Sequence, residues 1–185
     1  MADEPTYEVT ESAIPNIDDE EPKSFMDRMR RQRKAVADEE FHDLDLPGYH
    51  GELFCRYRLL DSTELNEINR KVRARIRNRN EQILAITLDN LIEACDEIWA
   101  RDNGREMPLR EHEDFQGNRD MPVKYDLAFA QFLNFASELG DSPSARGVLL
   151  AVFGGNDIAV QAHGAQLARW MMKMGTEVDE LLGEV

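Results

Sequence analysis

The 185-residue chain is poor in several features that mark well-defined protein classes. It has only two cysteines, Cys55 and Cys95, which lie far apart in unrelated contexts, so no disulfide framework is predicted. No apolar run approaches the roughly 20 residues that a membrane-spanning helix needs. The N-terminus is acidic, whereas a signal peptide begins with basic and then apolar residues. These absences predict a cytosolic protein with two buried, reduced thiols.

Motifs for catalysis and metal binding are also missing. No serine or cysteine lies in a recognisable nucleophile motif. Gly154-Gly155-Asn156-Asp157 opens a helix but places a carboxylate where a phosphate would bind. The histidines are scattered, and the polar run Glu111–Asp114 is read as a solvated loop. We therefore expect no enzyme activity, no cofactor and no metal site.

Basic residues are absent from residues 1–22, which contain eight carboxylates and few large apolar groups. Such a segment cannot bury enough surface to offset its ordering entropy, so we predict a disordered acidic tail. Residues 23–34 then carry six cations, and residues 70–79 form a second basic run. The net charge of -15 argues against a polyanionic partner, but local blocks can override it. We expect the tail to screen residues 23–34 until an acidic partner or a second copy competes.

The remaining sequence predicts a basic helix and linker over 23–43, followed by a helical domain over 44–185. Within 44–60, the turn signal Pro47-Gly48 precedes an alternation of apolar residues, which predicts a β-hairpin. Asp61 and Glu64 have capping-box spacing, so a helix should start there and continue through residue 79. The alternation of cations with Val72, Ala74 and Ile76 over 71–79 is the pattern of a strand, which is the alternative for that part. A wide apolar band predicts a core helix over 80–101, and the polar residues 102–124 a long loop.

Three further helices are expected, over 126–139, 143–153 and 156–181. Ser142 and Asn156 are the predicted caps of the second and third, with Pro143 in a first turn. The predicted fold class is therefore mainly α: a compact domain of about five helices with a small β-hairpin, preceded by a disordered acidic tail.

Two segments carry a family resemblance. The first runs from Leu46-Pro47-Gly48-Tyr49 to Leu59-Leu60-Asp61, and the second covers Val148–Val160 and is followed by His163 and Trp170. With the intervening stretch Ile98–Asp102, they resemble the tail assembly chaperones of long-tailed bacteriophages that infect actinobacteria. The likeness covers about residues 44–182. It rests on the order and general residue character of the segments and not on one diagnostic motif.

This resemblance implies a non-enzymatic role similar to that of the lambda-type tail chaperones. Such proteins coat and solubilise the tape measure protein in the host cytoplasm while the tail tube polymerises, and they are absent from the finished virion. Many are made in a short form and a frameshifted longer form. The expected partners are thus the tape measure protein and further copies or a longer form of the chain.

Candidate partner-binding residues are apolar or cationic. Methionine repacks readily against varied surfaces. The residues are Trp170, Met171, Met172 and Met174 in the last helix, and Arg28, Arg30, Arg31 and Arg33 in the first basic run. In an alternative interpretation Trp170, Met171 and Met174 are ordinary core residues, and only Met172 points away from the apolar stripe.

Two other functions remain open on the sequence. A nucleic-acid-binding phage protein would use residues 23–34 and 70–79, but neither run contains an aromatic residue for base stacking. A helix over 70–79 would also distribute its cations around most of its circumference. The other alternative is a structural protein of the virion, such as a tail or connector component.

Overall fold

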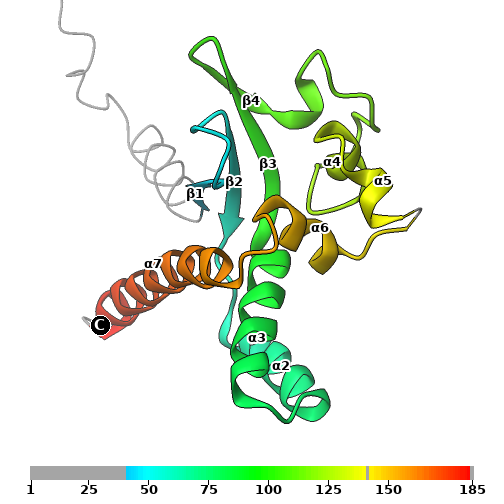
Figure 1. Cartoon of the computed structure of the whole chain (residues 1–185). Helices are drawn as coiled ribbons and strands as arrows, with labels where there is room; N and C mark the ends of the chain where they lie inside the picture. Colours follow the sequence, from blue (N-terminus) through cyan, green and yellow to red (C-terminus); the bar gives the residue numbers. More distant parts are fainter. Residues whose placement is uncertain (1–40, 141, 184–185) are drawn as a thin grey trace, which may run out of the picture. The chain divides into compact units, whose positions relative to one another are not determined.

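The computed structural model describes residues 41–140 and 142–183, with side chains described as far as residue 174 (Figure 1). The predicted acidic tail over 1–22 and the basic helix that was expected after it lie outside the described residues.

The sheet is larger than the sequence indicates. Its strands are β1 (Phe41–Asp45), β2 (Leu53–Arg58), β3 (Cys95–Asp102) and β4 (Arg105–Pro108). They form one antiparallel sheet in the order β1-β2-β3-β4. The predicted hairpin is present as β1 and β2, but it is only half of this sheet. The described residues combine four strands with six α-helices, so the prediction of a mainly α fold is wrong, and the domain is mixed α/β.

The main error concerns the predicted helix over 80–101. Helix α3 (Arg79–Ala94) ends at Ala94, and Cys95 begins β3 without an intervening loop. Cys95 and Ile98 continue the helical spacing of α3, and both are buried, but they also fit the inner face of a strand. There Cys95 lies opposite Tyr57 and Ile98 opposite Cys55 of β2, with a bulge between the two pairs. Burial alone therefore did not distinguish the two backbone conformations.

The predicted loop over 102–124 also contains regular structure. Asn103 and Gly104 have φ angles of 50° and 79°, as in the two-residue turns that join antiparallel strands. The sequence Asp102-Asn103-Gly104 is therefore a hairpin turn and not the end of a helix. It leads into β4 and a short 3₁₀ helix (Leu109–Glu111).

The capping box of the next helix is confirmed. In α2 (Ser62–Arg75) the Asp61 side chain accepts from the Glu64 N–H, and the Glu64 side chain accepts from the Asp61 N–H. The helix does not continue through residue 79, however, because Ile76 is extended. Asn78 caps the start of α3 by accepting from the Asn80 and Glu81 N–H groups. The second basic run therefore surrounds a corner between two helices.

The C-terminal helices follow the prediction in part. Residues 126–139 form two short helices, α4 (Leu127–Phe132) and α5 (Ala136–Leu139), separated near Asn134, whose φ is 61°. Helix α6 (Ala145–Val152) is capped by Ser144, not by Ser142. The long helix α7 (Asp157–Gly183) starts as predicted, with the Asn156 side chain accepting from the Ile158 and Ala159 N–H groups.

The order of elements makes α2 and α3 a helical hairpin inserted between two neighbouring strands, β2 and β3 (Figure 1). Helix α7 packs against α3, and α6 contacts α3 as well. The inner face of the sheet contributes Leu53, Cys55 and Tyr57 to the core. The core is completed by residues from the helices and the connecting loop, including Leu91, Phe115, Phe129, Val148, Val160 and Leu167.

The outer face of the sheet is covered by its own arginines. The Arg56 guanidinium lies 4.0 Å from the Trp99 ring centroid, and that of Arg101 lies 4.2 Å from the Phe54 centroid. Arg56 also donates two hydrogen bonds to Asp43, each 2.9 Å long. Cation–π contacts and ion pairs thus occupy these guanidinium groups.

A buried polar cluster joins the sheet to α7. The hydroxyls of Tyr57 and Tyr125 lie 2.6 Å apart, and the Tyr57 hydroxyl lies 3.0 Å from His163 Nε2. His163 is only 4% exposed, and burial lowers its pKa from 6.5 to about 4. The imidazole is therefore neutral in the folded protein at physiological pH.

This burial predicts a specific acid sensitivity. Between about pH 6.5 and pH 4 the unfolded chain protonates His163 and the folded chain does not, so the free energy of unfolding falls as pH falls. The loss of unfolding free energy due to His163 is absent above pH 7 and amounts to about 3 kcal/mol below pH 4. In denaturant titrations across this range, His163→Gln should flatten the pH dependence, whereas His50→Asn at an exposed histidine should not. Identical pH profiles for His163→Gln and the wild type would contradict the assignment.

A second prediction concerns the contact between α3 and α7. A Cβ added to Gly164 of α7 would overlap with Thr87 Cγ2, and the Thr87 hydroxyl is fixed by donating to the Ile83 carbonyl. Gly164→Ala should therefore destabilise the protein by about 1–3 kcal/mol, although alanine favours helix. Adding Thr87→Ala, which removes Cγ2, should restore much of this loss in a double-mutant cycle of denaturant unfolding. Additive effects of the two changes would show that the helices do not meet there.

Candidate functional site: an apolar groove

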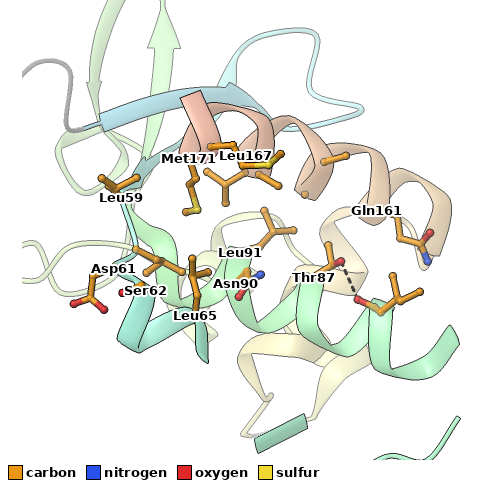
Figure 2. A pocket seen from close by; sticks show the side chains of 16 residues that line it. Leu59, Asp61, Ser62, Leu65, Thr87, Asn90, Leu91, Gln161, Leu167 and Met171 are labelled. Atoms are coloured by element: carbon orange, nitrogen blue, oxygen red, sulfur yellow. Dashed lines mark hydrogen bonds between the residues drawn. The ribbon is translucent and has the colours of Figure 1, made fainter. Parts of the chain in front are cut away.

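An open groove of about 800 Å³ runs between α2, α3 and α7 (Figure 2). Leu167 and Met171 reach into it from α7, and Leu91 faces them from α3. Its larger apolar lining residues are Leu59, Leu60, Leu65, Ile83, Leu91, Leu167, Met171 and Met172. The groove is therefore an apolar trough formed by helices that the sheet holds in place.

Small residues shape the α7 side of the groove. Gly164, Ala165 and Ala168 line it, and Gly164 lets α7 approach Thr87 of α3 closely. Ile83 and Met172 also line it, with 48% and 64% of their surfaces exposed. Apolar side chains this exposed at one hollow are typical of a surface that binds another molecule.

The polar groups of the groove are few. Its lining contains one carboxylate, Asp61, which already accepts a hydrogen bond from the Glu64 N–H as the helix cap. Asn90 contributes a buried oxygen, Oδ1, that accepts no hydrogen bond within the described part of the chain. The other polar side chains of the lining are those of Ser62, Thr87 and Gln161, so the surface is mainly apolar and suits binding more than proton transfer.

The predicted partner-binding residues do not all reach this groove. Met171 and Met172 line it, Met171 half-buried and Met172 exposed. Trp170 stacks instead on His42 of β1, with ring centroids 5.2 Å apart. Met174 is half-buried and is not part of the lining. The four arginines Arg28, Arg30, Arg31 and Arg33 lie outside the described residues.

Sequence reasoning missed the α3 side of the groove. Ile83 belongs to the wide apolar band that predicts a core helix over 80–101, and such a band by itself indicates an interior position. The signal was its position before Leu84, at the edge of the band, where a side chain can face a neighbouring helix without being covered by it.

Within residues 41–140 and 142–183, no three His, Cys, Asp or Glu side chains gather in a way that could hold a metal ion. His112, in the polar run Glu111–Asp114, accepts a hydrogen bond from the Asp114 N–H and packs against Phe132.

The two cysteines are neighbours in space although distant in sequence. Their sulfur atoms lie 3.3 Å apart, and both thiols are free and buried. The hydrogen bond from Cys55 and the burial raise the pKa of the Cys95 thiol well above its ordinary value. Cys95 therefore remains a thiol at neutral pH and is a poor nucleophile.

The described helices include none that combines the length and apolar character needed to cross a lipid bilayer. Comparison with known proteins gives no family: no family model, no curated protein and no solved structure matches the chain.

Proposed function

We propose that the protein is a non-enzymatic assembly chaperone that holds helical segments of a phage tape measure protein in the α2–α3–α7 groove while the tail tube forms. The observation that carries the proposal is the open apolar groove with Ile83 and Met172 exposed at it. The tape measure protein is proposed as the partner because the sequence resembles the tail assembly chaperones.

The groove has the features of a helix-binding surface. An amphipathic helix binds such a trough through apolar side chains spaced three and four residues apart. Ala165 and Ala168 give the partner backbone room to approach, and the thioethers of Met171 and Met172 can repack around different side chains. A chaperone for a long partner needs this tolerance, because many similar segments must bind in turn.

Co-expression tests the proposal. The full-length chain should raise the soluble yield of the tape measure protein of the same phage and co-purify with it. Met172→Glu places a charge at the groove and should reduce the co-purified amount by about tenfold, because a buried unpaired charge opposes apolar contact.

A matched control is available on the same helix. Ile158 of α7 is 79% exposed but does not line the groove, so Ile158→Glu should leave co-purification unchanged. Both variants should have wild-type melting temperatures, since both side chains face solvent. Equal losses in the two variants, or no co-purification with the wild type, would reject the groove as the binding site.

A further inference from the structure

A second surface lies at the corner between α2 and α3, at the end of the hairpin away from the sheet (Figure 1). Residues 70–79 contain six cations and no carboxylate. Because α2 ends at Arg75 and α3 begins at Arg79, these cations surround one corner. The expectation that a single helix carries all six cations is therefore wrong, because only four of them lie on α2.

The arginines of this corner differ from Arg56, Arg101 and Arg146, which are held by carboxylates. Arg56 and Arg146 each make two hydrogen bonds to one carboxylate, and Arg101 bridges two acidic residues. The corner arginines are all exposed, and within the described residues none lies in an ion pair: Arg70, Arg73, Arg75, Arg77 and Arg79. Lys71 alone is paired, with Glu67. Within the described residues, this corner thus concentrates positive charge with few carboxylate partners, although the chain has a net charge of -15.

An apolar hollow adjoins these arginines. It has a volume of about 210 Å³, and its lining includes Val72 and Ile76 with the side chains of Lys71 and Arg75. Its single carboxylate, Asp89, is already paired with Arg146. The hollow is large enough for one aliphatic side chain, with cations beside it to meet carboxylates.

This combination distinguishes between two kinds of anionic partner. A nucleic acid would present phosphates to the arginines but has no aliphatic group for the hollow, and residues 70–79 provide no aromatic ring for its bases. An acidic peptide with an aliphatic residue beside its carboxylates fits both features. We propose that the α2–α3 corner binds such an acidic peptide segment of a partner polypeptide.

A suitable probe can be taken from the chain itself. In residues 13–22, Ile17 is followed by Asp18, Asp19, Glu20 and Glu21. A fluorescent peptide of residues 13–22 should bind the full-length protein in an anisotropy titration. Binding should weaken by about tenfold or more between about 50 mM and 300 mM salt, because exposed ion pairs are screened. The measurement is repeated with the full-length variant Asp18→Asn, Asp19→Asn, Glu20→Gln, Glu21→Gln. In this variant the chain's own carboxylates do not compete with the peptide.

Charge reversal tests the location. Arg73→Glu with Arg77→Glu should lower the affinity of the peptide by about tenfold or more. Arg105→Glu with Arg169→Glu is the matched control, since both arginines are exposed and neither lies in an ion pair within the described residues, and it should change the affinity less than about twofold. A peptide with Ile17→Asn should bind about fivefold more weakly, because the hollow loses its apolar occupant.

Several results would overturn the proposal. These are no saturable binding at low salt to either full-length protein, equal losses in the two charge-reversal variants, or unchanged affinity of the Ile17→Asn peptide. Tighter binding of a short DNA duplex than of the peptide at the same arginines would assign the corner to nucleic acid. Met172→Glu should leave peptide binding intact, so the groove and the corner can fail independently.

Discussion

The antiparallel pairing of β2 with β3 constrains most of this domain. The chain leaves the sheet at the end of β2 and must return to the neighbouring strand, so the intervening residues run out and back as α2 and α3. With 14 and 16 residues, these helices extend about 20 Å from the sheet. Helix α7 is attached to the same sheet through the hydrogen bond between Tyr57 and His163, and it packs along α3. The groove exists because both α3 and α7 are anchored at the sheet.

The same pairing accounts for the distribution of arginines. Those on the sheet lie among aspartates and glutamates of neighbouring strands, where a pleated surface brings opposite charges within reach. Arg56 and Asp43, for example, are direct cross-strand partners. At the far end of the helical hairpin no strand supplies carboxylates, and residues 70–79 contain none themselves. The far end of the hairpin is therefore locally basic although the chain as a whole is acidic.

Local signals in the sequence were predictive where one residue determined the backbone. The caps at Asp61 and Asn156 and the alternation in β2 were read correctly, because each depends on neighbours within a few residues. The change from helix to strand at Cys95 was not predicted, because both conformations bury Cys95 and Ile98. Only the pairing of β3 with β2 and β4 selects the strand. The groove was predicted only through Met171 and Met172. Its other wall depends on how α3 and α7 meet, which no pattern within a single segment specifies.

The groove and the corner share α3 but use different faces of it. Ile83 and Thr87, four residues apart, line the groove, whereas Asp89, which borders the apolar hollow, is turned toward Arg146 of α6. A segment bound on one face therefore leaves the other accessible. Each contact by itself is modest, since exposed ion pairs contribute little and a shallow groove covers only one side of a helix. A partner that carries both an amphipathic helix and an acidic segment would gain from their linkage, because binding the first raises the effective concentration of the second. Two linked contacts of this kind can dissociate one at a time, so each contributes to the lifetime of the complex without fixing it alone.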